Sequence, residues 1–150
     1  MIIATPTRRL VLLTALAVLL GFAGGGAAWV LLHGISIITN LALLHRWSTA
    51  SPSLAGYHPG WSLYVVAIAG ALAISSLARW APVIRGHGIP EAMEAVLTRQ
   101  SRVSPRTAIA KPISAVIAIG TGAPFGAEGP IIVTGGSIGS LLGQVIPVSP

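Results

Sequence analysis

Charged residues are scarce in this chain: they make up 8% of its 150 residues, whereas 53% are hydrophobic. Soluble domains carry about 25% charged residues, so this chain has too few charges to cover a water-exposed surface. A mean hydropathy of +0.83 also excludes a disordered polar segment, whose composition is poor in apolar residues. The scarcity of charge therefore indicates a membrane protein.

Cysteine is absent altogether, which excludes disulfide scaffolds, thiolate nucleophiles and Cys-ligated metal sites. His33, His45 and His58 are too dispersed to form a metal site. We expect neither a metal nor a cofactor. The sequence also shows no pair of a nucleophile and a base, so we do not expect an enzyme. The net charge is +6, but the basic residues are spread over an apolar chain and form no basic patch, so nucleic acid is not an expected partner.

Two long uncharged runs predict helices that cross a membrane. The first covers about residues 10–44, which as a helix is roughly 50 Å long, against about 30 Å of hydrocarbon. The second predicted span covers about residues 61–80, of which 61–78 are uncharged, and has Trp61 and Trp80 at its ends, where amphipathic aromatic side chains prefer the membrane interface. The first run is long enough that we expect it to be tilted or kinked.

A cleaved signal peptide is the alternative interpretation of the first thirty residues, because Arg8 and Arg9 precede an apolar stretch that ends in small residues. However, apolar sequence continues from Trp29 to Leu44 without a polar mature start. A membrane span therefore fits this segment better.

Glycines predict two features of these helices. Gly24, Gly25 and Gly26 lie within the first span and are a candidate kink or close-packing point. Glycines also recur every four residues near the end of the chain, at positions 135, 139 and 143. This small-xxx-small face predicts close packing against another helix.

The basic residues cluster on one side of the predicted spans. Only Arg46 lies in the loop 46–60, and two arginines precede the first span. Six cations lie at the end of the second span or after it: Arg79, Arg85, Arg99, Arg102, Arg106 and Lys111. By the positive-inside rule, we expect a multi-pass protein of the cell membrane with a cytoplasmic N-terminus and the loop 46–60 outside.

Two stretches rich in glycine and proline interrupt the second half of the chain. The first, 86–90, precedes a short helix that we expect at about 90–98. The second, 120–130, separates two broken helices expected at about 107–122 and 129–146. A helix that begins within the membrane presents unpaired N–H groups and the positive end of its dipole, which attract anions. Short apolar segments interrupted by glycine are typical of the binding sites of transporters.

Glu128 is the only acidic residue after Glu94 and lies in an otherwise apolar region. An ionised side chain inside a membrane costs at least ~2.5 kcal/mol and is functional by default. A carboxylate is favoured at a helix N-terminus for the same reason as an anion, so it can compete for the place of the anion. This competition predicts a gate; the alternative is that Glu128 only caps a helix.

The stretches 86–91 (GHGIPE) and 126–130 (GAEGP) resemble the GSGIPE and GREGP motifs of the CLC family of chloride channels and proton-coupled chloride transporters. The glycine-rich stretch 131–140 is also similar to the helix that follows GREGP in many bacterial members. The resemblance implies an all-α integral membrane fold, the N-terminal part of the CLC inverted-repeat bundle, with broken half-helices starting near Gly88 and Glu128. It also implies that the chain is an N-terminal fragment, which by itself is not expected to conduct.

The resemblance implies roles for seven residues. Glu128 occupies the position of the family's gating glutamate, and His87 that of the serine whose hydroxyl coordinates the central anion. The positions implied to bind the anion are His87, Gly88, Ile89, Gly126, Ala127 and Gly129. Because His87 replaces a serine and Ala127 an arginine, anion selectivity stays open.

The implied function is transmembrane chloride transport, either as a voltage-gated channel or as a chloride/proton antiporter, and the sequence does not separate these two. Chloride and the lipid bilayer are the expected partners, chloride being the transported ligand and not a cofactor. By resemblance the whole protein would be a homodimer. The alternative from another class is a membrane-embedded structural or assembly subunit without transport, in which Glu128 and His87 face buried packing instead of a water-accessible path.

Overall fold

The computed structural model describes residues 7–85, 93, 97 and 103–145. All regular structure in these residues is helical: α1 (Thr7–Ala42), α2 (Trp61–Trp80), the short 3-10 helix η1 (Pro82–Arg85), α4 (Pro105–Gly120) and α5 (Glu128–Val145). Residues 93 and 97 are helical, but the rest of the short helix expected at 90–98 lies outside the described residues.

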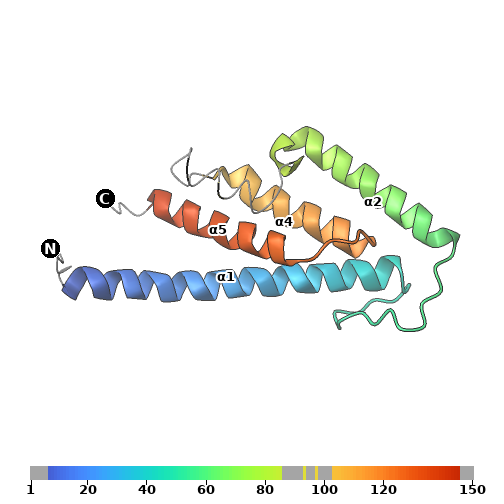
Figure 1. The fold of residues 1–150 in the computed structure, drawn as a ribbon, viewed down its shortest axis with the longest axis horizontal. Coiled ribbons are helices and arrows are strands. Elements are labelled where there is room, and N and C mark those ends of the chain that lie inside the picture. The colour runs from blue at the N-terminus through green and yellow to red at the C-terminus, as the bar shows by residue number, and fades with distance from the viewer. Residues whose placement is uncertain (1–6, 86–92, 94–96, 98–102, 146–150) are drawn as a thin grey trace.

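Successive long helices run in opposite directions (Figure 1). The C-terminal ends of α1 and α4 therefore lie at the same end of the molecule as the start of α2. We call this the loop end, because it carries the connection 43–60. Away from the loop end, α2 ends and α4 begins alongside the middle part of α1, and α1 extends beyond both (Figure 1).

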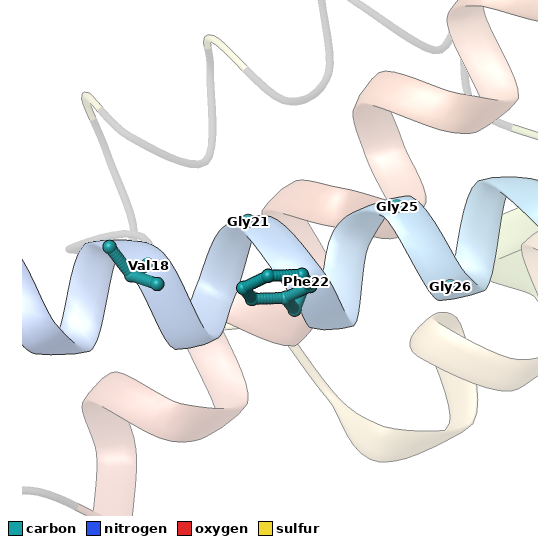
Figure 2. A pocket seen from close by; sticks show the side chains of 5 residues that line it. All are labelled: Val18, Gly21, Phe22, Gly25 and Gly26. Atoms are coloured by element: carbon teal, nitrogen blue, oxygen red, sulfur yellow. The ribbon is translucent and has the colours of Figure 1, made fainter.

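Helix α1 is a single unbroken helix of 36 residues, roughly 54 Å long and therefore longer than the hydrocarbon layer is thick. The kink expected at Gly24–Gly26 is not present, since α1 runs straight through these glycines (Figure 1). They are not close-packing points within the described residues either, because a Cβ at any of them would meet nothing within 4 Å. A shallow apolar hollow on this part of α1 is lined by Val18, Gly21, Phe22, Gly25 and Gly26 (Figure 2).

Helices α1, α4 and α5 pack against one another, and α2 packs on α4. Glycine permits two close approaches between α1 and α4. A Cβ on Gly120 of α4 would lie 2.6 Å from the Cβ of Ile38 on α1, and a Cβ on Gly34 of α1 would lie 3.2 Å from a methyl group of Val116 on α4. Small residues at such points let the helix backbones approach each other closely, as is typical of helix packing in membranes.

The glycine face of α5 was expected to pack against another helix, but it has no close neighbour in the described part of the chain. A Cβ at Gly135, Gly139 or Gly143 would meet no heavy atom within 4 Å. These glycines therefore do not set the spacing between the described helices, whereas Gly34 and Gly120 do.

Away from the loop end, α5 binds Val103, two residues before α4 begins, through hydrogen bonds. The N–H of Val103 donates to Ser140 Oγ at 2.8 Å, and its carbonyl accepts from Gln144 Nε2 at 3.3 Å. Ser140 and Gln144 are one helical turn apart and so lie on the same face of α5. Ser104 then caps α4, because its Oγ accepts from the N–H of Thr107 at 3.3 Å.

Candidate functional site

The break between α4 and α5 begins with a glycine cap. Gly122 has a φ of +100°, in the left-handed region that favours glycine. Its N–H donates to the carbonyl of Ile119 at 3.0 Å, and the N–H of Ala123 donates to the carbonyl of Ala118 at 3.0 Å. This pair of bonds is a Schellman motif, which satisfies the last carbonyls of α4. The glycine- and proline-rich stretch 120–130 is therefore not irregular throughout, because its first residues form the ordered end of α4.

Helix α5 begins at the expected acid. Its first residue is Glu128, and the carbonyl of Ala127 accepts the first helical hydrogen bond, from the N–H of Ile131 at 3.0 Å. Ala127 is therefore the N-cap residue. Pro130, the third residue of the helix, has no N–H to contribute.

The backbone just before and inside this helix start offers unpaired donors. Four successive N–H groups donate no hydrogen bond to another described residue: those of Gly126, Ala127, Glu128 and Gly129. The last two belong to the first turn of α5, where the helix dipole places roughly half a positive charge. Such a helix end is an anion-binding arrangement that contains no cationic side chain.

The side chain of Glu128 is exposed. Within the described residues it has no hydrogen-bond or ion-pair partner. No described side chain therefore fixes the carboxylate of Glu128, and no described side chain accepts a hydrogen bond from the first N–H groups of α5.

The start of α5 does not lie at the tip of the molecule. The connection from α4 runs back along α1, so that α5 begins alongside the middle part of α1 (Figure 1). Helix α5 packs on both α1 and α4. A helix that starts part-way along a longer one places its N-terminal end within the length of the bundle.

The described part of the site consists of Gly126, Ala127, Glu128 and Gly129. The other three expected anion-binding positions, His87, Gly88 and Ile89, lie outside the described residues. None of the four described site residues lines the hollow on α1 shown in Figure 2. Among the described residues, no group of three or more His, Cys, Asp or Glu side chains is arranged to hold a metal ion.

A polar cluster that the sequence analysis did not single out lies at the end of α1. Asn40 is fully buried, and its Nδ2 donates to the carbonyls of Ser48 at 3.0 Å and Ala50 at 2.9 Å. Its Oδ1 accepts from Nε of Arg46 at 2.8 Å. The signal in the sequence was an amide near the end of an apolar run, six residues before the one cation of the following loop.

Two of the described helical segments, Leu10–Ala42 and Trp61–Trp80, are long and apolar enough to cross a membrane, by length and composition. With the all-helical structure of the described residues, this is the architecture expected of α-helical integral membrane proteins.

The sequence model of one protein family, described as voltage gated chloride channel, matches residues 69–149. The match covers just over half of the chain and includes both of the motifs that carry the resemblance. The chain belongs to this family, the CLC family, which confirms the resemblance and the all-α membrane fold. A search of the curated proteins and a search of the solved structures found no match.

Proposed function

We propose that this protein carries chloride or a similar small anion across a membrane, as a channel or as a chloride/proton antiporter, with Glu128 as its gate. The observation that carries the proposal is that α5 starts at Glu128 and that the N–H groups of residues 126–129, at and just before this start, have no partner in the described residues. This helix start lies within the stretch that matches a family of chloride channels.

The anion site proposed here is built from backbone and not from a cationic side chain. The N–H groups of Gly126, Ala127 and Gly129 would donate to the anion, and the dipole of α5 would add its positive end. Glycine at two of these positions leaves the backbone open to close approach. Ala127 contributes an N–H like any residue but adds no charge.

Glu128 gates this site by competition. Its carboxylate belongs to the first turn of α5, where a negative charge is stabilised in the same way as a bound anion. When ionised, the carboxylate takes the place of the anion; when protonated, it loses that attraction and leaves. Anion flux should therefore rise as the pH falls.

The first motif would complete the path. A ring nitrogen of His87 would donate to the anion in place of the hydroxyl of the family's serine, with Gly88 and Ile89 at the start of the neighbouring helix. Because histidine changes its charge near neutral pH, the pH response and anion selectivity should differ from those of a serine-bearing relative.

The orientation proposed for the chain in the cell membrane has the N-terminus in the cytoplasm. It is supported by the placement of the cations, since Arg46 follows α1 at the loop end, whereas the end of α2, η1 and the first turn of α4, which carry Arg79, Arg85 and Arg106, lie away from it. The positive-inside rule assigns the richer end to the cytoplasm. A homodimer with one path in each subunit is proposed from the family resemblance.

The test is chloride efflux from liposomes that contain the protein made from its complete reading frame. Glu128→Gln removes the titratable charge at nearly constant size, and Glu128→Ala vacates the position. We expect both variants to carry chloride at neutral pH severalfold faster than the wild type and to lose the rise in flux that protonation of Glu128 causes, so that any pH dependence that remains belongs to His87. Proton movement recorded in the same assay distinguishes the two forms of the proposal, because a channel moves chloride without protons.

The matched control is Glu128→Asp, which keeps a carboxylate in the first turn of α5. We expect this variant to retain the pH dependence. If neither Glu128→Gln nor Glu128→Ala alters chloride flux or its pH dependence, Glu128 is not the gate. If the wild type carries no chloride at all, a non-transporting structural or assembly subunit becomes the better explanation.

A further inference from the structure

We propose that Arg46 is a fixed cation that concentrates small monovalent anions at the loop end of the molecule, beside the break that leads to Glu128. The proposal deepens the proposed function and rests on it in one respect, since the anions gathered are those that the site on α5 would take. Arg46 and the cluster that holds it lie outside the stretch matched by the chloride channel family.

Arg46 is held by Asn40 at two points. The backbone N–H of Arg46 donates to the carbonyl of Asn40 at 3.1 Å, and its Nε donates to Oδ1 of the same residue at 2.8 Å. Asn40 is in turn immobilised, because it is fully buried and its Nδ2 donates to two loop carbonyls. The base of the guanidinium group is therefore fixed relative to α1.

The charge of Arg46 is not neutralised by this arrangement. Oδ1 of Asn40 is a neutral acceptor, the arginine is exposed, and its two terminal nitrogens make no hydrogen bond with any described residue. The sequence has no acidic residue before Glu91, so no carboxylate of the first two helices or of their connection can pair with it. Asn40 thus orients a full positive charge toward the surroundings.

The position of this charge connects it to the candidate site. The break between α4 and α5 begins at Gly120, which packs against Ile38, two residues before Asn40. On the other side, a Cβ on Gly122 would lie 3.4 Å from Leu63, in the first turn of α2. The break therefore starts between the last turns of α1 and the first turns of α2, at the same end as Arg46 (Figure 1).

Among the described cationic side chains, only that of Arg46 lies at the loop end. The motif position 127 holds an alanine, and the other cations whose side chains the structure describes belong to the end of α2, to η1 and to the first half of α4, away from the loop end. A fixed charge raises the local concentration of counter-ions and the rate at which they arrive. This effect reaches about 10 Å at 0.1 M salt and about 30 Å at 0.01 M, so it should be visible mainly at low ionic strength.

Trp47 offers a direct reporter of anions at this place. It follows Arg46 in the chain, and its side chain is 77% exposed. Iodide quenches tryptophan fluorescence on contact, so its effect depends on the exposure of the indole ring and on the local concentration of anions. Acrylamide is neutral, so its effect depends on the exposure of the ring alone. The difference between the protein and its Trp47→Phe variant isolates the signal of Trp47 from the other tryptophans.

Arg46→Gln keeps a donor for Oδ1 of Asn40 but removes the charge. At an ionic strength of about 0.01 M, we expect iodide quenching of Trp47 to fall roughly threefold while acrylamide quenching stays unchanged, and we expect the difference to vanish near 1 M salt. Arg46→Lys, which keeps the charge, should restore iodide quenching. Arg79→Gln, which removes a cation that lies away from the loop end, should leave it unchanged. All variants are measured at the same pH.

The proposal is overturned if iodide quenching in Arg46→Gln equals that of the wild type. It is also overturned if iodide and acrylamide quenching change together, because Arg46 would then only hold the loop in shape. Quenching does not require transport, so the two proposals fail separately. A wild type without chloride flux but with Arg46-dependent quenching counts against the proposed function, whereas normal flux without Arg46-dependent quenching counts against the role of Arg46.

Discussion

Asn40 shows how one buried amide shapes the loop end. Its side chain and its carbonyl together bind Arg46, Ser48 and Ala50, and His45, just before Arg46, takes a φ of +52°. The chain thus turns around Asn40 as it leaves α1. Because a buried amide costs free energy unless its groups are paired, this residue specifies one conformation of the loop.

We expect Asn40→Ala to lower the free energy of unfolding by about 2 to 3 kcal/mol, because three hydrogen bonds are lost and their partners are only partly exposed. Unfolding in mixed micelles with increasing sodium dodecyl sulfate, followed by circular dichroism, measures this change. The matched control is Ser48→Ala, which keeps the carbonyl that Asn40 binds and removes a hydroxyl whose contact with the N–H of Ala50 is exposed. A comparable loss in the two variants would show that Asn40 does not organise the loop.

Glu128 was predictable from the sequence, whereas the donors around it were only partly so. A single acid in an apolar region beside glycine and proline indicates a helix start with a function. Which N–H groups stay unpaired depends on which carbonyl accepts the first helical hydrogen bond, and the structure assigns this role to Ala127. Whether an anion binds there stays a prediction that flux measurements test.

At the scale of elements, glycine has opposite roles in α4 and α5. Gly120 lies where α4 meets α1, and an added Cβ there would come within 2.6 Å of Ile38. Gly139 of α5 has no such neighbour among the described residues. Sequence periodicity favoured the second position for close packing, because a repeat every four residues is visible in the chain while a contact between two helices is not.

We expect Gly120→Ala to destabilise the protein by about 1 to 3 kcal/mol, because the Cβ of Ile38 is close to its own backbone and has little room to move aside. Gly139→Ala should leave stability unchanged or raise it by up to about 1 kcal/mol, since alanine favours a helix more than glycine does. The same micelle unfolding assay compares the two variants. A larger loss at Gly139 than at Gly120 would mean that α5, and not α4, makes the close helix contact.

The lengths of the elements followed from composition, but their continuity did not. Uncharged runs fix where a helix can cross the membrane, and α1 and α2 lie within those runs to a few residues. The triple glycine in α1 suggested a kink, but glycine bends a helix only where packing or an inserted group favours the bend. No described residue packs on these glycines, and α1 stays straight.

For the whole molecule, the placement of cations determines the proposed orientation, and the absence of cysteine from the chain makes it testable. We expect Ser51→Cys, in the exposed loop at the loop end, to react with a membrane-impermeant maleimide on intact cells. Arg85→Cys, exposed in η1, should react only after the membrane is opened. The unsubstituted protein, in which the 150 residues offer no thiol, gives the background.

The opposite labelling pattern would reverse the orientation, and labelling of both positions on intact cells would exclude a span between them. A reversed orientation would still allow the anion site on α5, because its N–H groups do not depend on which side faces outward. It would, however, move Arg46 to the cytoplasmic face, where it would attract anions from inside the cell.

The sequence by itself determined that this protein is an α-helical membrane protein. It also determined which family the chain resembles and which carboxylate is the candidate gate. These properties depend on composition and on local motifs, and both are visible along the chain. The tertiary structure decided which glycines bring helices together, which N–H groups at the start of α5 have no described partner, and that Asn40 fixes Arg46 beside the break. Each of these depends on atoms that are distant in sequence or on the choice of one hydrogen-bond acceptor among several, and folding alone makes that choice.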